Sequence, residues 1–398
     1  MVANAMALAA WACAALLTVL SVRALRAATV GRPAAGEGCV SLSVIVAAHN
    51  EAPRIGALVE SVLSQDHPNF ELLIVDDGST DGTLAAASEA AHGDPRVQLL
   101  RVDARPPGWQ GRMHAQSIGE ASARCEWLLF LSADQRLVDS DFFRAILAEY
   151  ARRGVAAASV LGPFVGDRWW QTWWLRPIAE NPVLLGCVFL LQRLRPDATW
   201  LIGALAMPRE TYRTVGGAAS AALFGAGVFD DWGWTRVFEL RRLRTAMVYH
   251  TALHDVSNWT SFGDCWSGLS RWAAGILTSR GGAWAAAVAL SAAALLCTFA
   301  TGRVVIDLLS LRLPAIAWTA LAAIPPTVGV AHCLWHGYRA WWAALSAPIA
   351  LWLLTPLAGG VWARVRNRIR WHDQELLVVA DPPADRGQER SDGRPIAE

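Results

Sequence analysis

The sequence predicts an α/β fold with a mostly parallel, Rossmann-like central sheet, on the strength of three observations. Residues 43–47 and 72–75 are short apolar runs rich in β-branched side chains, which is typical of buried strands. The segment between them repeats apolar residues at the spacing of a helix. These residues are Ile55, Leu58, Val59, Val62 and Leu63. The run WLLFL at 127–131 predicts a third buried strand, and the helical crossover between the first two requires them to lie parallel.

Polar side chains follow each of these strands, at the ends where an open α/β sheet binds its ligands. They are Asn50 and Glu51 after the first strand, Asp76 and Asp77 after the second, and Ser132 and Asp134 after the third. Adjacent acids can accept hydrogen bonds from a base and a ribose, which predicts a nucleotide site, and Asp134 can hold a divalent cation beside it. The alternative is an ordinary strand–helix–strand unit with solvated turn acids, since turns favour Asp, Gly and Ser. The repetition of the clusters favours the nucleotide site.

Two other segments carry side chains suited to catalysis. The turn at 107–112 combines glycines, which let a ligand approach the backbone closely, with Arg112, whose guanidinium suits phosphate oxygens. Asp230 and Asp231 precede a helix-like stretch at 234–243. They predict either a pair that caps the helix or a general base that deprotonates an acceptor hydroxyl, and the sequence leaves both readings open.

The composition indicates a membrane-associated protein without a nucleic-acid partner. Of the 398 residues, 54% are hydrophobic and only 17% are charged, which is too apolar for a wholly soluble chain. The net charge of +1 provides no field that would attract nucleic acid. The seven cysteines are scattered without a CxxC pair, so we expect a reducing compartment and no zinc site.

The first residues predict a retained membrane anchor. Residues 4–22 are uncharged and about as long as the ~20 residues that a bilayer core requires. Arg23, Arg26 and Arg32 follow the apolar run, whereas a signal peptide carries its positive charge in front. We therefore expect residues 1–26 to anchor the chain and residues 40–280 to form a cytoplasmic domain, by the positive-inside rule.

The remainder of the chain predicts two or three further apolar segments within 284–362 and a basic, then polar, cytoplasmic tail at 363–398, disordered at its end. Pro325-Pro326 interrupts the middle segment, which makes it the candidate for a re-entrant piece. Within the domain, the Trp-rich and Arg-rich segment 168–195 suits a membrane interface, with a core helix as the alternative. Arg271 and Trp272 precede the first C-terminal span, where such residues either anchor the chain or contact a ligand.

Taken together, the motifs resemble the inverting, GT-A-type glycosyltransferases of family 2 over roughly residues 40–275. The resemblance rests on AAHNEAPRI, VDDGSTDGT, WLLFLSAD, GALAMPRETYRTVGG, FDDWGW and SRW, in that order. The segment PGWQGRMHAQSIGEA is similar to the membrane-bound subgroup that glycosylates carotenoid-type and hopanoid-linked lipids. The resemblance implies a GT-A nucleotide-sugar-binding fold flanked by transmembrane helices, in a multi-pass protein of the cell membrane. It also implies a nucleotide-diphospho-sugar donor, in particular a UDP-sugar, a lipid acceptor and a divalent cation, Mn²⁺ or Mg²⁺.

The resemblance also assigns roles to residues of this chain. Asn50, Glu51, Asp76 and Asp77 would contact the nucleoside of the nucleotide-sugar, and Arg112 would lie near its diphosphate. Ser132 would also contact the nucleotide-sugar, Asp134 would bind the metal, and Asp231, beside Asp230, would be the base. Arg271 and Trp272 would close over the diphosphate or the acceptor. Three features depart from the family pattern. Gly233 and Trp234 stand where hydrophobic residues usually follow the acid pair. Ser132 replaces the first acid of the DxD motif, and Gly268 replaces the Gln of the QxxRW motif, which argues against a processive polysaccharide synthase. Such a synthase, or a catalytically silent scaffold that binds nucleotide-sugars, is the alternative.

Overall fold

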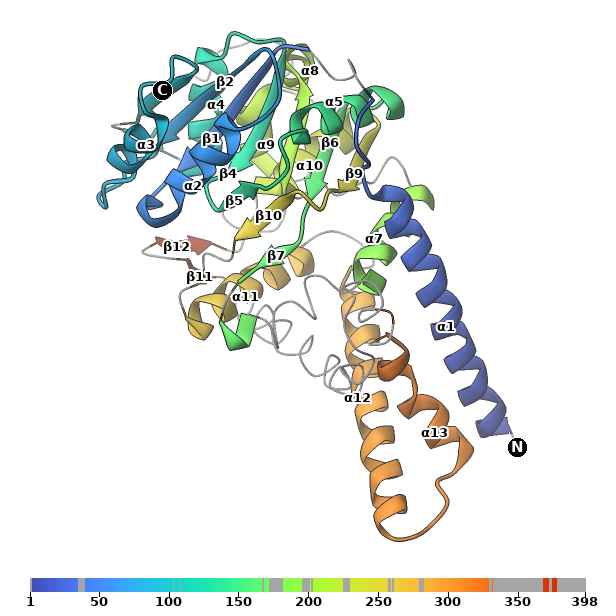
Figure 1. The fold of residues 1–398 in the computed structure, drawn as a ribbon. Helices are drawn as coiled ribbons and strands as arrows, with labels where there is room; N and C mark the ends of the chain where they lie inside the picture. Colours follow the sequence, from blue (N-terminus) through green and yellow to red (C-terminus); the bar gives the residue numbers. More distant parts are fainter. Residues whose placement is uncertain are drawn as a thin grey trace.

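The computed structural model describes most of the chain. It covers residues 2–328 except 35–39, 172–181, 195–200, 225–229 and 279–282 and the single positions 103, 108, 167, 202, 257, 258 and 260, together with residue 331 and residues 368–371 and 374–377. An α/β domain carries a group of helices that project from it (Figure 1). The predicted α/β class is confirmed.

A seven-stranded sheet forms the centre of the domain, in the order β3-β2-β1-β4-β8-β6-β9. Its strands are β1 (Leu42–Ala48), β2 (Phe70–Asp76), β3 (Val97–Arg101), β4 (Trp127–Ser132), β6 (Ala157–Leu161), β8 (Ala204–Pro208) and β9 (Thr245–Tyr249). All neighbours pair in parallel except at β8, which runs antiparallel to both β4 and β6. The three predicted strands are β1, β2 and β4, each slightly longer than its apolar run.

Helices cover both faces of the sheet, which explains why the strands are apolar along their whole length. One core contains residues of α2 (Ala52–Leu63), α3 (Thr83–Ala91) and α5 (Phe142–Arg153). The other contains residues of α4 (Gly111–Ser122), α8 (Arg209–Thr214), α9 (Gly217–Phe224) and α10 (Asp230–Leu240). The helical spacing predicted for α2 is confirmed, because Ile55, Leu58, Val59 and Val62 are all buried.

A small second sheet lies next to the end of β4. It consists of β5 (Gln135–Leu137), β10 (Leu253–Val256) and β7 (Phe164–Val165), with β10 in the middle. The backbone amide of Val256 donates to the carbonyl of Asp134 at 2.8 Å, which ties β10 to the turn that follows β4. The turn that carries Ser132 and Asp134 is therefore fixed by β4, which leads into it, and by β10, which is hydrogen-bonded to it.

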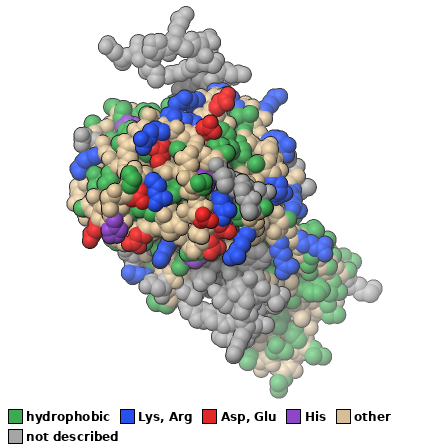
Figure 2. Space-filling model, turned by 45° about the horizontal axis from the view of Figure 1, so that its top comes forward, with side chains coloured by type: hydrophobic (Ala, Val, Ile, Leu, Met, Phe, Trp, Pro, Cys, Tyr) green, Lys and Arg blue, Asp and Glu red, His purple; other side chains and the backbone are tan. Residues whose placement is uncertain are grey.

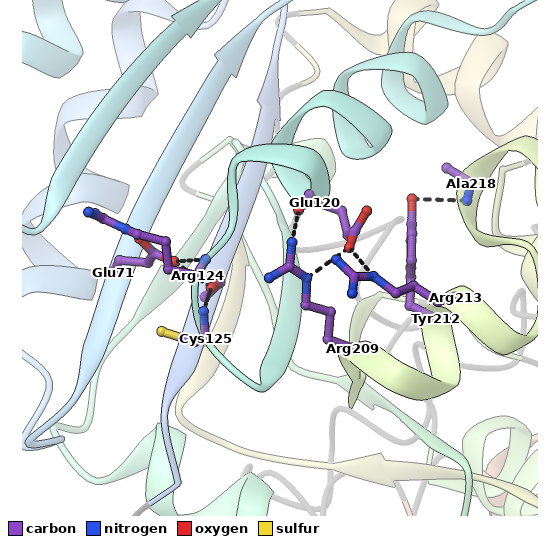
Figure 3. A network of polar contacts seen from close by, with 9 residues as sticks. Glu71, Glu120, Arg124, Cys125, Arg209, Tyr212, Arg213 and Ala218 are labelled. Atoms are coloured by element: carbon purple, nitrogen blue, oxygen red, sulfur yellow. Dashed lines mark hydrogen bonds and ion pairs between the residues drawn. The ribbon is translucent and has the colours of Figure 1, made fainter.

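Polar networks stabilise the region around the amino ends of the strands and the neighbouring helices (Figure 3). Glu71 is buried near the start of β2 and accepts hydrogen bonds from the Ser43 hydroxyl at 2.7 Å and from the Arg124 amide at 2.6 Å. Although burial alone would raise it, these bonds and the Arg124 guanidinium hold the pKa of Glu71 below its usual value. A second network joins Glu120 of α4 to Arg209 and Arg213 of α8.

The projecting helices are α1 (Val2–Ala28), α12 (Ala283–Leu309) and α13 (Ile316–Ala322). Within the described part of the chain, α1 is the single helix both long and apolar enough to cross a membrane. The indole of Trp11 donates to the hydroxyl of Thr327 at 3.3 Å, and α7 (Pro182–Leu194) packs against α1 near the domain. The part of the predicted apolar region 284–362 that follows residue 331 lies outside the described residues. The basic tail contains a two-stranded hairpin, β11 (Arg368–Trp371) and β12 (Gln374–Leu377).

The helix α1 is joined directly to the sheet. Val30 donates its amide to the Tyr249 carbonyl at 2.8 Å, so the chain leaving α1 forms a β-bridge with the edge strand β9. Side chains of α1, α7 and β9 share one apolar cluster, which includes Leu25, Phe189 and Met247. The apolar N-terminal helix is thus packed onto the α/β domain instead of being attached by a free linker.

Candidate active site

The carboxyl ends of β1, β2 and β4 meet at one edge of the sheet, as the sequence predicts. Ala48 of β1 pairs with Asp76 of β2, and Ala47 pairs with Ser132 of β4. The polar clusters that follow the three strands therefore converge. This edge is where an open α/β sheet binds its ligands.

The loops after β1 and β2 are hydrogen-bonded to each other. Asn50 has a positive φ of 55°, a left-handed conformation that Asn tolerates better than most residues. Its amide donates to the Ser79 hydroxyl at 2.9 Å, and its side-chain oxygen accepts from the Thr80 amide at 3.0 Å. The Glu51 amide donates to the Thr83 hydroxyl at 2.8 Å. Much of the NE and DDGST motifs therefore serves to hold these two loops together.

The adjacent acids Asp76 and Asp77 have different environments. Asp76 is 1% exposed, and its carboxylate accepts from the Ser79 amide at 3.1 Å, which closes the turn after β2. The side chain of Asp77 is 14% exposed to solvent. Its carboxylate accepts a hydrogen bond from Arg105 Nη1 at 3.1 Å. Sequence reasoning missed Arg105, because its only signal is a position in the loop just before the predicted turn 107–112.

The first turn of α4 lies between the Asp77 and Asp134 regions. A Cβ at Gly111 would overlap the Asp77 carboxylate and would lie 2.6 Å from Arg105 Nη1, so glycine permits this close approach. The next residue, Arg112, donates from Nη2 to the Ser132 hydroxyl at 2.8 Å. A second glycine, Gly119, lets α4 pack tightly on Ile45 of β1 and so fixes the position of the helix.

Two carboxyl groups near this edge have raised pKa values. Burial raises the pKa of Glu51 to about 7, although Arg54 lies 2.9 Å away and acts in the opposite direction. Burial likewise raises the pKa of Asp134, against the favourable charges of Arg112 and Arg54. Perturbed carboxyl groups at the ligand-binding edge of a sheet are typical of a functional site.

The residues at this edge are compatible with a divalent cation. Asp134 supplies one carboxylate beside the Ser132 hydroxyl, and Mg²⁺ is commonly held by one or two carboxylates together with substrate phosphates. Among the residues that the structure describes, no group of three His, Cys, Asp or Glu side chains converges on one point. The described residues alone therefore do not enclose a cation, and a ligand or further residues would have to complete the coordination.

Asp230 and Asp231 form the first turn of α10, which begins four residues before the predicted helix. This position is favourable for acids, since the helix dipole is positive there. Asp231 is half-buried, and its carbonyl accepts from the Thr235 hydroxyl at 3.0 Å. Trp234 is packed in the core on Phe130 of β4, which places α10 beside that strand. The side chains of Asp230, Arg271 and Trp272 lie outside the described residues.

Comparison with known proteins assigns the domain. A model of the family described as glycosyl transferase family 2 matches residues 43–210, which include the three strand ends and Arg112. Residues 43–210 form a family 2 glycosyltransferase domain. A solved mannosyltransferase from Pyrobaculum calidifontis, in complex with GDP-Man and Mn²⁺, is 21% identical with a TM-score of 0.50 and covers 91% of this chain and 99% of its own. At that identity the likeness shows the fold, which is GT-A-like.

Curated relatives match part of this chain. A 4,4'-diaponeurosporenoate glycosyltransferase of Staphylococcus haemolyticus is 31% identical over 129 residues, 32% of this chain and 33% of its own. The succinoglycan biosynthesis protein ExoO of Rhizobium meliloti is 37% identical over 103 residues, 26% of this chain and 28% of its own. The chain spans about a third of the length of the first of these relatives.

Proposed function

We propose that this chain is a membrane-bound, inverting glycosyltransferase that moves a sugar from a nucleotide-diphospho-sugar to an isoprenoid-type lipid. The observation that carries the proposal is the convergence of Asp77, Arg112 and Asp134 at the carboxyl edge of a family 2 domain. The staphylococcal relatives are named 4,4'-diaponeurosporenoate glycosyltransferase, and that name supports the lipid acceptor.

The donor would lie across the ends of β1, β2 and β4. Asp77 accepts hydrogen bonds from the base, and the loop built by Asn50, Glu51 and Asp76 holds the nucleoside side of the site. Arg112 and Ser132 receive the diphosphate, since a guanidinium donates well to phosphate oxygens. We favour a UDP-sugar. A divalent cation, Mn²⁺ or Mg²⁺, bound at Asp134 would supply Lewis-acid stabilisation of the departing diphosphate.

The transfer step requires a base on the acceptor side. Asp231, at the start of α10, takes the proton of the acceptor hydroxyl, or orients an acceptor carboxylate that needs no deprotonation. The acceptor oxygen bonds to the anomeric carbon as the bond from that carbon to the diphosphate oxygen breaks, on the opposite face, so the configuration inverts. We expect Arg271 and Trp272 of α11 (Phe262–Thr278) to close over the diphosphate or the acceptor, and Asp230 to belong to the catalytic pair with Asp231.

The projecting helices would place this site at a membrane. The surface of α1 exposes large apolar side chains, and so does the distal part of α12. Examples are Met6, Leu16, Val19, Phe299 and Leu309. Arg23, Arg26 and Arg32 are exposed where α1 meets the domain, and basic side chains gather beside the apolar projection in Figure 2. By the positive-inside rule the domain faces the cytoplasm in a multi-pass protein of the cell membrane.

The structure favours single-sugar transfer over polysaccharide synthesis. A Cβ at Gly268, the position of the QxxRW glutamine, would lie 2.8 Å from the indole of Trp259. Trp259 therefore occupies the space that a glutamine side chain would need. A processive synthase that relies on this glutamine does not fit the packing of α11.

Isolated membranes provide the test. Membranes with wild-type chain, with Asp231→Asn and with the exposed control Asp139→Asn are supplied with radiolabelled UDP-sugars, an isoprenoid lipid and Mn²⁺ or Mg²⁺. Wild type and Asp139→Asn should transfer label to lipid, and Asp231→Asn should lose at least ~100-fold of the rate. Equal rates for Asp231→Asn would remove this residue as the base, and no transfer from any donor would favour the scaffold.

A further inference from the structure

A buried hydrogen bond joins α4 to α10, the two helices that carry Arg112 and Asp231. The indole Nε1 of Trp234 donates to the side-chain oxygen Oε1 of Gln116 at 3.4 Å. Both side chains are buried, so water does not compete for this bond. The two residues are 118 positions apart in the sequence, and only the fold brings them together.

Both helices begin at the carboxyl edge of the sheet. α4 ends at Ser122 just before β4 begins, and α10 ends at Leu240 just before β9 begins. β9 has the same direction as β4, because it is parallel to β6 and two antiparallel pairings separate β6 from β4. α4 and α10 therefore both run from the carboxyl edge to the amino edge. Their first turns, with Arg112 and Asp231, lie at the edge where the donor is proposed to bind.

Gln116 and Trp234 each follow a residue of the proposed reaction by one helical turn. Arg112 is four residues before Gln116 on α4, and Asp231 is three residues before Trp234 on α10. Residues three or four apart lie on the same face of a helix. The bond between Gln116 and Trp234 therefore sets the separation of the two faces that carry Arg112 and Asp231.

The indole of Trp234 makes two kinds of contact. Its ring stacks on Phe130 of β4, with centroids 6.1 Å apart and an angle of 28° between the planes, which sets the distance of α10 from the sheet. Stacking tolerates sliding in the plane of the rings, whereas an N–H···O bond weakens steeply as its angle departs from linear. The bond to Gln116 therefore fixes where α10 lies across the sheet. A phenylalanine at 234 could supply the stacking but not the bond.

We infer that Gln116 and Trp234 are positioning residues, and that their hydrogen bond holds Asp231 at the distance from the donor that in-line attack requires. This assignment rests on the proposed function and adds to it two buried residues that act through Arg112 and Asp231. It also gives a purpose to Trp234, at which the sequence departs from the family pattern. An aliphatic side chain there could not donate to Gln116.

Kinetics of the full-length chain in lipid vesicles test the assignment, with an isoprenoid lipid, Mn²⁺ and radiolabelled UDP-sugars. Gln116→Met and Trp234→Phe each remove one partner of the bond and keep most of the side-chain shape. Each should lower kcat at least about tenfold, because small errors in the orientation of reactants are costly. The KM for the donor should stay within about twofold of wild type, since α4 keeps its contacts with Ile45 and Ser132.

The double variant separates positioning from stability. It leaves neither partner unsatisfied, so its melting temperature should exceed that of the less stable single variant. Its kcat should stay low, within about threefold of the single variants, because all three lack the same bond. A double variant that recovers kcat together with its stability would overturn the inference.

Tyr212→Phe is the matched control in the same aromatic cluster. The Tyr212 hydroxyl accepts from the Ala218 amide at 3.0 Å (Figure 3), and its ring stacks on Phe130. The variant loses a buried hydrogen bond outside the link between α4 and α10, so it should lower the melting temperature and leave kcat unchanged. Wild-type kcat in Gln116→Met would by itself overturn the inference and leave the proposed function standing. No transfer by wild type from any donor would overturn the proposed function, and the positioning role with it.

Discussion

Arg105 and Asp77 form an ion pair of 3.1 Å directly against the first residue of α4. Only one carboxylate oxygen of Asp77 takes part in this bond, which leaves the other oxygen able to accept from a base. The pair is two-thirds or more shielded from solvent, with Arg105 at 32% and Asp77 at 14% exposure of the side chain. Arg105 therefore orients the acid on which nucleoside binding is proposed to depend.

Replacing Arg105 should weaken nucleotide binding by loosening Asp77. We expect Arg105→Gln to reduce the affinity for UDP by about tenfold, in keeping with the loss of one charge-assisted hydrogen bond. Arg105→Lys should recover part of the loss. Calorimetric titration measures both, and Arg152→Gln is the control at an exposed ion pair. If Arg105 instead competes with the base for Asp77, the Gln variant will bind UDP more tightly than wild type.

Gly111→Ala should damage the same site by a steric route. Its methyl group would overlap the Asp77 carboxylate and force it away from the edge of the sheet. Alanine favours the helix over glycine, so the melting temperature should not fall by more than a few degrees. UDP affinity should fall at least about tenfold. A variant that binds UDP normally would mean that Asp77 can move without consequence for the ligand.

The sequence predicted the strands and helices of this site better than the contacts inside it. Apolar periodicity identifies β1, α2, β2 and β4, because burial on both faces of the sheet imposes the pattern directly. The antiparallel insertion of β8 between β4 and β6 left no local signal. The contacts from Arg105 and Arg112 to residues 20 or more positions away depend on where α4 lies against the sheet, which no local pattern in the sequence reports. The sequence predicted that Gly111 lets a ligand approach the backbone closely. In the structure the group that lies against Gly111 is the carboxylate of Asp77.

Stability should depend on pH through Glu51. Burial raises its pKa from 4.5 to about 7, so the folded chain binds this proton more tightly than the unfolded chain. The stabilisation is complete below pH 4.5 and is lost as the pH rises through 7. Glu51→Gln removes the titration, so its free energy of unfolding relative to wild type should rise between pH 5 and pH 8, by at most ~3 kcal/mol. Its melting temperature relative to wild type should rise over the same range. The exposed Glu89→Gln is the control, and parallel profiles for wild type and Glu51→Gln would contradict the expectation.

A substitution of Glu71 tests whether a disturbance at the amino ends of the strands reaches the proposed nucleotide site at their carboxyl ends. Glu71→Ala leaves the Ser43 hydroxyl and the Arg124 amide without their acceptor, which should cost about 2–3 kcal/mol of stability. Because Glu71 lies at the opposite end of β2 from Asp76, UDP affinity of the folded fraction should be unchanged. A lower affinity at a temperature well below the melting point would show that the strand transmits the disturbance.

The packing of α1 on α7 should matter for the lipid acceptor and not for the donor. A side chain at Gly186 would overlap the backbone of Ser21, so the two helices approach each other closely only because position 186 is glycine. Gly186→Leu should push α1 away from α7 and disturb the apolar cluster that also contains Met247 of β9. We expect UDP affinity within about twofold of wild type and transfer to a membrane lipid reduced at least ~10-fold, because orientation of the reactants contributes strongly to the rate. Leu190→Ala, on the same helix, removes apolar contact without the clash and should have the smaller effect. Loss of UDP binding in Gly186→Leu would instead mean that α1 supports the fold of the domain itself.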